Sequence, residues 1–310
     1  MLAMLWGGSF VAIKEVVRDI PSWFAAAARL WVATFSLYIL FKYGMHKSLR
    51  LSSGSHLRVW FTGLITIGIP FAFLFWGERF ISAGLAGMLN GSVPLLTAGL
   101  VLIAPTQDER GSLSVKTLAG LGIGFLGILA IFAPLISEPG SQEFWGALAV
   151  AMMAVCYALG NILNKRNFQN FAGLSVYAAV FHQSLASLIF LSLGAAIFDP
   201  LPSWQTLTAK PSTIPSIIYL GTFSTALALT LYFYLIKKWG SVKTSAIAYL
   251  IPLFTIIFDA LIFKNFPTLP AWLGMALILL GITLIRKREP KKIMVEIETE
   301  SAEELTRKAS

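Results

Sequence analysis

The chain has 310 residues, of which 56% are apolar and only 13% are charged. Because an ordinary soluble domain carries roughly 25% charged residues, this composition excludes a soluble protein and indicates an integral membrane protein. The net charge of +9 is then no sign of nucleic-acid binding, since in a membrane protein the distribution of basic residues among the loops carries the information. The single cysteine, Cys156, excludes a disulfide framework and a thiolate metal site, and we expect no cofactor.

Apolar runs of about 20 residues, the length that a bilayer core of about 30 Å requires, follow one another along the chain. Polar or Pro/Gly-containing segments such as Asp199-Pro200 separate them. No basic stretch precedes the first run, so we expect no cleavable signal peptide. We predict an all-α membrane protein with ten transmembrane helices, at residues 2–18, 24–43, 57–76, 80–104, 115–136, 143–163, 173–197, 212–236, 243–263 and 270–287.

Basic residues gather in alternate connections between these runs. One set of connections holds Lys47, Arg50, Lys165 and Lys237, and the C-terminal segment adds more, whereas the opposite connections hold few. Positively charged loops stay in the cytoplasm. We therefore predict a multi-pass protein with both termini cytoplasmic.

The apolar sequence contains a repeat. Residues 94–97 read Pro-Leu-Leu-Thr, and residues 252–255 read Pro-Leu-Phe-Thr. Gly63 precedes the first of these prolines by 31 positions, and Gly221 precedes the second by the same 31. Two landmarks at one spacing indicate a duplicated unit, and the prolines Pro94 and Pro252 indicate helix bends.

The repeat divides the chain into a first five-helix unit at residues 1–136 and a second at residues 143–288, followed by a charged cytosolic tail at 289–310. Because five is odd, the second unit enters the membrane with the opposite orientation. Inverted repeats are typical of alternating-access transporters that bind substrate at the repeat interface. A further echo near the unit ends supports this division: Gly120 and Gly127 match Gly274 and Gly281, both seven apart.

Ionisable side chains within or beside the apolar runs need an explanation, because each costs roughly 2.5–3.5 kcal/mol on insertion scales. These residues are Lys14, Arg29, Glu78, His182 and Asp259. In one interpretation they pair with one another, hydrogen-bond between helices or reach the interface. In the other, Lys14 or Arg29 anchors an anionic group of a substrate, and Glu78, His182 and Asp259 are proton-coupling sites. Both interpretations stay open at this point.

Neutral polar and aromatic residues in the runs are candidates for the wall of a substrate cavity. They could equally join helices through hydrogen bonds or lie in the aromatic belts at the membrane surface. The candidate substrate-binding residues are Trp6, Phe10, Trp76, Asn90, Tyr157, Asn161, Thr225, Tyr232 and Tyr249.

The stretch LWGGSFVAIKEV at residues 5–16, followed by Pro21 and AAAARLW around Arg29, resembles the opening of an EamA-type member of the drug/metabolite transporter superfamily. The resemblance continues through the Pro94 and Pro252 runs to the closing WLGMALILLGITLI. One departure concerns a Gly-Glu-Arg-like turn that the family commonly has after the proline-bearing span. The first half has Asp-Glu-Arg at 108–110, and the second has Lys-Asn-Phe at 264–266 without an acid.

The resemblance implies a ten-helix inner-membrane carrier that moves small metabolites, often outward and often amino acids or related compounds. It also implies a central cavity lined by the first, third, fourth, sixth, eighth and ninth spans, which hold all nine candidate substrate-binding residues.

We therefore predict a secondary transporter that exports a small polar or amphipathic metabolite by alternating access. The alternatives are uptake of a nutrient or nucleotide-like solute by the same fold, and a lipid flippase. An enzyme has little support, because the sequence holds no P-loop and no arrangement of catalytic side chains above chance. The expected partners are the small-molecule substrate, the bilayer and protons as a coupling ion, with no nucleic acid, in a monomer or homodimer.

Overall fold

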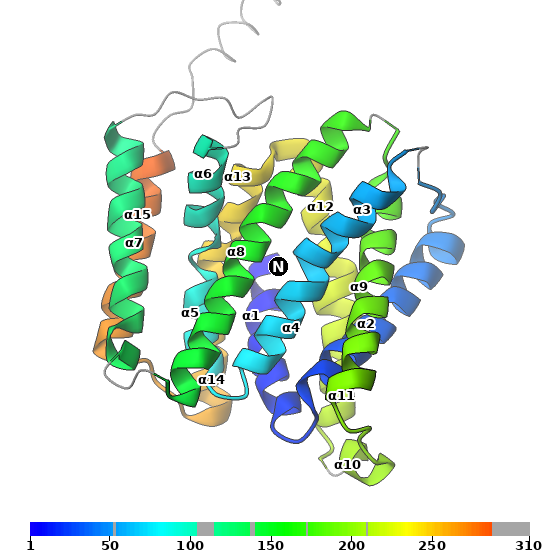
Figure 1. Cartoon of the computed structure of the whole chain (residues 1–310), viewed down its shortest axis with the longest axis horizontal. Coiled ribbons are helices and arrows are strands. Elements are labelled where there is room, and N and C mark those ends of the chain that lie inside the picture. Colours follow the sequence, from blue (N-terminus) through cyan, green and yellow to red (C-terminus); the bar gives the residue numbers. More distant parts are fainter. Residues whose placement is uncertain (52–53, 104–114, 137–139, 172, 209, 287–310) are drawn as a thin grey trace, which may run out of the picture.

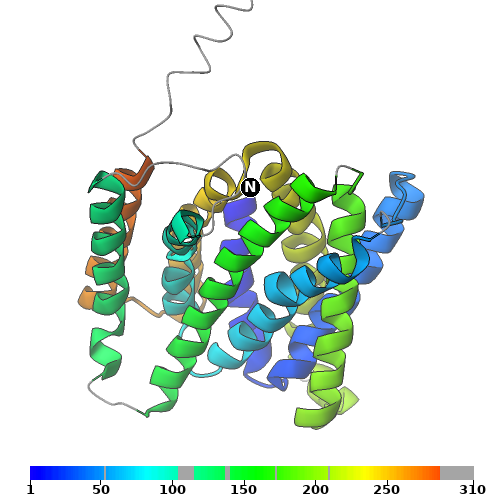
Figure 2. The ribbon, with the colours of Figure 1, turned by 45° about the horizontal axis from the view of Figure 1, so that its top comes forward.

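The computed structural model describes residues 1–51, 54–103, 115–136, 140–171, 173–208 and 210–286. Throughout these residues the regular structure is helical, without a β-strand. The helices stand side by side in a bundle, with α7 and α15 at one edge and α2 at the other (Figures 1 and 2). The Asp-Glu-Arg turn at 108–110 and the 289–310 tail lie outside the described residues.

Several of the apolar runs consist of two or three consecutive helical pieces. The π-helical turns η2 and η4 and the 3-10 turn η5 join α-helices, and the π-helical turn η1 ends the run that begins with α2. The first half contains α1 (Leu2–Val17), α2 (Ser22–Ile39), η1 (Leu40–Gly44), α3 (His56–Gly63), η2 (Leu64–Gly68), α4 (Ile69–Gly77), α5 (Ala83–Asn90), α6 (Val93–Ile103) and α7 (Val115–Ile136). The second half contains α8 (Gln142–Asn170), α9 (Val176–Phe198), α10 (Trp204–Thr208), α11 (Thr213–Gly221), η4 (Thr222–Leu227), α12 (Ala228–Trp239), α13 (Ser241–Ser245), η5 (Ala246–Leu250), α14 (Ile251–Phe263) and α15 (Leu269–Arg286).

Seven helical segments in the described part of the chain are long and apolar enough to cross a membrane. They are Ser22–Gly44, His56–Gly77, Ala83–Ile103, Gln142–Asn170, Val176–Phe198, Thr213–Trp239 and Lys243–Phe263. The apolar parts of α7 and α15 are shorter, at Ala119–Leu135 and Leu269–Leu284. The protein is therefore a multi-pass membrane protein, and the number of ten spans stays a prediction.

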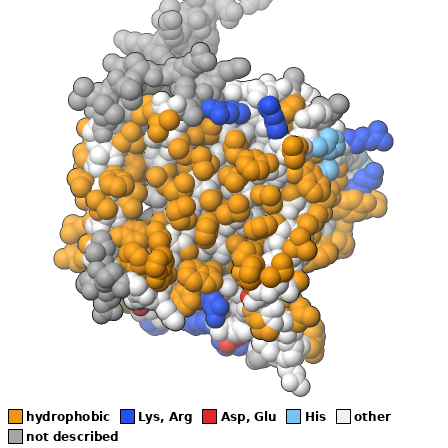
Figure 3. Space-filling model, viewed as in Figure 1, with side chains coloured by type: hydrophobic (Ala, Val, Ile, Leu, Met, Phe, Trp, Pro, Cys, Tyr) orange, Lys and Arg blue, Asp and Glu red, His pale blue; other side chains and the backbone are white. Residues whose placement is uncertain are grey.

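The surface agrees with this assignment. Apolar side chains cover the middle of the face shown in Figure 3, and the basic and acidic side chains lie toward its ends. Large side chains such as Trp31, Phe35 and Ile197 are more than half exposed on the helices. In water such a surface would be costly, whereas in a bilayer it faces lipid tails of the same polarity.

A π-helical turn follows each of the two glycines that open the repeated spacing. Gly63 ends α3 just before η2, and Gly221 ends α11 just before η4. A Cβ atom at Gly63 would lie 2.7 Å from the carbonyl oxygen of Gln183, and one at Gly221 would lie 2.9 Å from the carbonyl oxygen of Arg29. Glycine is needed at both positions because two helices cross there at backbone contact.

The two repeated prolines lie at helix starts. Pro94 is the second residue of α6, which begins after a break at residues 91–92, and Pro252 is the second residue of α14, which begins after η5. Proline fits the first turn of a helix because the amide hydrogen that it lacks has no partner there. Both predicted bends thus coincide with interruptions of the helical run.

Candidate functional site: a cavity between the two halves

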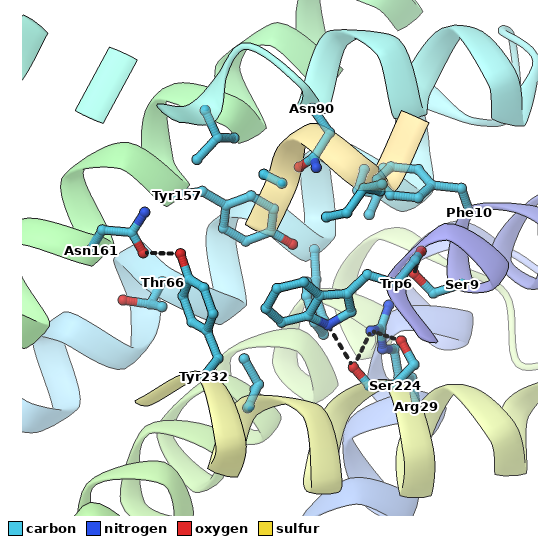
Figure 4. A pocket seen from close by; sticks show the side chains of 16 residues that line it. Trp6, Ser9, Phe10, Arg29, Thr66, Asn90, Tyr157, Asn161, Ser224 and Tyr232 are labelled. Atoms are coloured by element: carbon cyan, nitrogen blue, oxygen red, sulfur yellow. Dashed lines mark hydrogen bonds between the residues drawn. The ribbon is translucent and has the colours of Figure 1, made fainter. Parts of the chain in front are cut away.

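A cavity of about 70 Å³ lies between the helices (Figure 4). It has room for roughly five water molecules, each of which needs about 10–15 Å³ of such volume. Helices from both halves of the chain line it. The lining residues are Trp6, Ser9, Phe10, Arg29, Thr66, Phe71, Leu74, Asn90, Val93, Tyr157, Asn161, Ser224, Leu229, Tyr232, Ala248 and Ile251.

Hydrogen bonds within and between the two halves hold the aromatic wall in place. The Trp6 indole Nε1 donates to the carbonyl oxygen of Ser224 at 3.0 Å, and the Tyr232 hydroxyl donates to Asn161 Oδ1 at 3.0 Å (Figure 4). The rings of Trp6 and Tyr232 meet edge to face, with centroids 4.9 Å apart. Asn161 Nδ2 in turn donates to Thr97 Oγ1 at 3.4 Å. The wall therefore combines aromatic rings with oriented polar groups of the kind that fix the position of a bound solute.

The π-helical turns bring hydroxyl groups to the cavity. Thr66 belongs to η2 and Ser224 to η4, and both side chains line the cavity. In η4 the Thr225 hydroxyl donates to the carbonyl oxygen of Leu220 at 2.7 Å, five residues earlier. A π-helical turn widens the helix locally and is frequent at functional sites.

Arg29 of α2 is the charged residue in the lining, and only 2% of its surface is exposed. Its Nε donates to Thr225 Oγ1 at 2.7 Å, and its Nη2 donates to Ser224 Oγ at 3.1 Å. The guanidinium carbon lies 4.1 Å from the centre of the Phe71 ring. The η4 turn and an aromatic face therefore hold the guanidinium in one orientation.

The lining residues fall into pairs at two fixed spacings along the chain. Five pairs are 158 positions apart: Thr66/Ser224, Phe71/Leu229, Leu74/Tyr232, Asn90/Ala248 and Val93/Ile251. Two pairs are 151 positions apart: Trp6/Tyr157 and Phe10/Asn161. The spacing of 158 is also that of Gly63 and Gly221 and of Pro94 and Pro252. Corresponding positions of the two halves thus line the cavity together, and only Ser9 and Arg29 lack a counterpart in the lining.

Six of the nine candidate substrate-binding residues surround this cavity: Trp6, Phe10, Asn90, Tyr157, Asn161 and Tyr232. The other three lie elsewhere. Thr225 is buried beside the cavity, where it bonds Arg29. Tyr249 follows the lining residue Ala248 but packs against the hydrophobic core. Trp76 is 37% exposed and lines a wide outer groove with Trp23, Phe73 and Trp145.

The candidate ionisable residues other than Arg29 are separate from the cavity lining. Lys14 Nζ donates to the carbonyl oxygens of Glu78 at 2.7 Å and Ile81 at 2.8 Å. Asp259 Oδ2 accepts a hydrogen bond from the backbone amide of Gly84 at 2.8 Å. Glu78 is fully buried, and neither of its carboxyl oxygens has a hydrogen-bond partner among the described residues.

His182 lies in the second turn of α9 rather than at the centre of the bundle. Its Nε2 lies 2.9 Å from the carbonyl oxygen of Leu49, and the Trp60 indole donates to its Nδ1 at 3.4 Å. An indole nitrogen can only donate, so Nδ1 accepts and Nε2 carries the proton. Both ring nitrogens are thus occupied by neighbouring groups, which favours the helix-joining interpretation of this histidine.

Several lining residues did not emerge from the sequence: Ser9, Thr66, Phe71, Leu74, Val93, Ser224, Leu229, Ala248 and Ile251. The 158-residue spacing of the repeated glycines and prolines would have found some of them. Applied to Asn90 and Tyr232, it leads to Ala248 and Leu74. The described residues contain no group of three or more His, Cys, Asp or Glu side chains that could hold a metal ion.

The EamA-like transporter family model matches this chain twice, at residues 1–133 and 144–287. The chain belongs to the EamA-like transporter family. Its members are transporters rather than enzymes. A chloroplastic WAT1-related protein of Arabidopsis thaliana is 26% identical over 291 residues, which cover 90% of this EamA-like chain and 66% of the plant protein.

Two bacterial relatives match over nearly their whole length. The uncharacterized transporter YoaV of Bacillus subtilis is 22% identical, covering 91% of this chain and 92% of that protein. A protein of Escherichia coli named "Probable amino-acid metabolite efflux pump" is 25% identical, covering 91% of each. A solved crystal structure shares the fold with a TM-score of 0.65 at 16% identity, covering 92% of this chain and 94% of that chain.

The contact between Tyr232 and Asn161 leads to a prediction about stability. Tyr232→Phe removes the hydroxyl and leaves Asn161 Oδ1 without this donor, which should lower stability by about 1 kcal/mol. The measurement is thermal unfolding of the purified protein in detergent. Tyr234→Phe is the matched control on the same helix, because Tyr234 is 52% exposed. Equal effects of the two changes would contradict this role of the hydroxyl group.

Proposed function

We propose that this EamA-like protein is a secondary transporter that exports a small polar or amphipathic metabolite by alternating access between two inverted five-helix repeats. The repeats are residues 1–136 and 143–288, in a bacterial-type inner membrane with both termini in the cytoplasm. Amino acids or related compounds are the favoured substrates. The name of the Escherichia coli relative supports both the substrate class and the outward direction.

The pairing of the cavity residues is the observation that carries this proposal. A cavity at the interface of two inverted repeats presents corresponding positions of each repeat to one bound solute. Fourteen of the sixteen lining residues form such pairs, at spacings of 158 and 151. A channel or an enzyme site on an unrelated helical bundle has no reason to show this regularity.

The directions of the helices support the inversion. In Figure 1, α1 runs downward and its counterpart α8 runs upward, and α2 and its counterpart α9 are likewise opposed. In the proposed mechanism the two bundles rock about the cavity, and the interruptions at Pro94 and Pro252 allow α6 and α14 to tilt. The cavity then opens to one side at a time.

Uptake by the same fold remains the alternative, because gradients set the direction of a secondary transporter. A flippase needs a polar path open to the lipid. The outer groove beside Trp76 is walled mainly by aromatic and aliphatic side chains, which does not favour that function.

Transport itself is tested by flux into proteoliposomes across a panel of amino acids, nucleosides and sugars, with and without a pH gradient. We expect saturable flux of one solute class. Trp6→Ala should reduce it strongly, because Trp6 lines the cavity and donates to Ser224. Trp31→Ala is the control, because Trp31 is 61% exposed on α2. Absence of flux for every compound of the panel would contradict export of a polar metabolite and favour lipid-like substrates.

The inverted orientation is tested by labelling single cysteines from outside the cell. The chain allows this, because its one cysteine, Cys156, is buried. Asp19 follows α1 and Asn170 is the last residue of the corresponding helix α8, and both are exposed. We expect a membrane-impermeant thiol reagent to label Asp19→Cys but not Asn170→Cys. Labelling of both would mean that the two halves have the same orientation.

Proton coupling is a further part of the proposal, with Glu78, His182 and Asp259 as the candidate residues, whereas Lys14 and Arg29 are candidates for ion pairing or for anchoring an anionic group. The burial of Glu78 and its lack of a hydrogen-bond partner among the described residues support its choice as the first target. Flux driven by a pH gradient should depend on it. Intact gradient-driven flux after substitution of Glu78, His182 and Asp259 together would remove proton coupling at these residues.

A further inference from the structure

The cavity contains one charge and nothing that neutralises it. Arg29 is the charged side chain among the sixteen lining residues, and a guanidinium stays protonated in proteins. Within the described part of the chain, no carboxylate oxygen forms an ion pair with it. A buried and unpaired charge is costly in a membrane protein and is a sign of function.

The guanidinium also has a donor to spare. Thr225 and Ser224 satisfy Nε and Nη2, whereas the buried Nη1 has no hydrogen-bond partner among the residues that the structure describes. The stacking on Phe71 at 4.1 Å and the two bonds to η4 prevent the group from turning away. An oriented cation with a free N–H is the arrangement that binds an oxyanion.

The position of Arg29 breaks the pairing of the two halves. At the crossing next to Gly221, the glycine contacts the carbonyl oxygen of Arg29. At the equivalent crossing in the other half, Gly63 contacts the carbonyl oxygen of Gln183, so Gln183 is the residue that corresponds to Arg29. Gln183 is neutral, fully buried and outside the cavity lining. The uncharged lining residues other than Ser9 thus come in corresponding pairs from the two halves, whereas the positive charge of Arg29 has no counterpart. A bound solute therefore has one preferred orientation.

We infer that the substrate carries a carboxylate, which binds Arg29 through Nη1, while its apolar part lies against Trp6 and Tyr232. This inference deepens the proposed function and rests on it. The lining residues include no Asp or Glu, so a carboxylate is required of the substrate and an ammonium group is not. The volume of the cavity corresponds to roughly five waters, which limits the substrate in this conformation to a compound of about that size.

Three related probes test the assignment. Alanine is a zwitterion, propanoate is alanine without its amino group and is negatively charged, and ethylamine is alanine without its carboxylate and is positively charged. Their binding to the purified full-length protein is measured by ligand-induced thermal stabilisation at constant ionic strength. We expect propanoate and alanine to stabilise the wild type and ethylamine to have no effect. Stabilisation by ethylamine equal to that by propanoate would overturn the assignment, and this comparison needs no variant.

Variants then locate the anion. Arg29→Gln should weaken propanoate binding by roughly ten-fold or more, because a charge-assisted hydrogen bond is lost, and Arg29→Lys should retain part of the affinity. Arg50→Gln removes the same charge from an exposed position outside the helices and should bind as the wild type does. Unchanged propanoate binding by Arg29→Gln would overturn the role of Arg29.

Flux of the same probes separates this inference from the proposed function. Ethylamine flux without propanoate or alanine flux would overturn the carboxylate assignment and leave transport standing. Carboxylate binding without flux of either carboxylate would support the anion site and count against transport. If propanoate and alanine show neither binding nor flux, the carboxylate assignment is overturned.

Discussion

Replacing Gly127 by valine should force helices α7 and α15 apart and lower the unfolding temperature far more than the same change at Gly122. A Cβ atom at Gly127 would lie 2.5 Å from the carbonyl oxygen of Gly274 and 2.8 Å from the amide nitrogen of Ile278. Both are backbone atoms, so no side chain can rotate away. Overpacking of this kind costs typically about 1–3 kcal/mol, and a clash with backbone belongs at the upper end.

Gly122 is the matched control because it lies on the same helix and a Cβ atom there would meet nothing within 4 Å. Both substitutions introduce the same β-branched residue into α7, so any loss of helix propensity is shared. The measurement is the apparent unfolding temperature of each purified variant in the same detergent. Equal losses at the two positions would mean that α7 and α15 do not cross at Gly127.

The contact between α7 and α15 involves the glycines that are repeated in the two halves of the chain. Gly127 of α7 contacts Gly274 of α15, and a Cβ atom at Gly281 would meet the carbonyl of Gly120. Gly120 and Gly127 are the glycines that match Gly274 and Gly281 in the repeat. Each glycine of the first half contacts one of the second half, in reverse order along the chain. The corresponding change Gly281→Val should therefore destabilise the protein as much as Gly127→Val does.

The second large effect should be a dependence of stability on pH that Glu78→Gln removes. Glu78 directly follows the apolar segment that ends at Gly77, and its carboxyl group is fully buried without a hydrogen-bond partner among the described residues. Burial raises the pKa of Glu78 well above its usual 4.5; Asp259 adds to this shift, whereas the positive charges of Lys14 and Arg29 oppose it. The carboxyl group is therefore neutral in this conformation at pH values where an exposed glutamate is ionised.

The sign follows from proton linkage. Below the usual pKa of 4.5 the carboxyl group is neutral in both the folded and the unfolded protein. As the pH rises through that value, only the exposed carboxyl of the unfolded protein ionises, so the folded state loses stability until the pH passes the raised pKa. Glutamine has nearly the same shape and cannot ionise. The variant should therefore be more stable than the wild type, by a margin that grows with pH.

The measurement compares unfolding temperatures of Glu78→Gln and the wild type from mildly acidic to mildly alkaline pH. Glu143→Gln is the control, because Glu143 is exposed at the start of α8, and its difference from the wild type should not grow over this range. A constant difference for Glu78→Gln as well would mean that Glu78 is ionised in the folded protein. A difference that grows with pH would mean that Glu78 is neutral in the folded protein and ionises when unfolding exposes it to water.

The membrane class and the positions of the helices follow from the sequence alone. In lipid every backbone polar group must be satisfied within the chain, so an apolar run of sufficient length has to be helical. The repeated glycines and prolines can also be recognised in the sequence, because glycine suits a close helix crossing and proline suits the first turn of a helix. The equal spacing from Gly63 to Pro94 and from Gly221 to Pro252 therefore predicts the duplication, whereas the π-helical turns η2 and η4 that follow the two glycines are visible only in the structure.

The face that each helix turns to the cavity was decided by the tertiary structure. Trp6 and Trp76 look alike in the sequence, yet Trp6 lines the cavity and Trp76 lines the outer groove. In a soluble helix the apolar face identifies the core, but lipid tails are as apolar as the interior of a helix bundle. Apolar periodicity consequently says little about which side faces inward. The partners of Arg29, Ser224 and Thr225, are nearly 200 residues away, and only the packing of α2 against η4 brings them together.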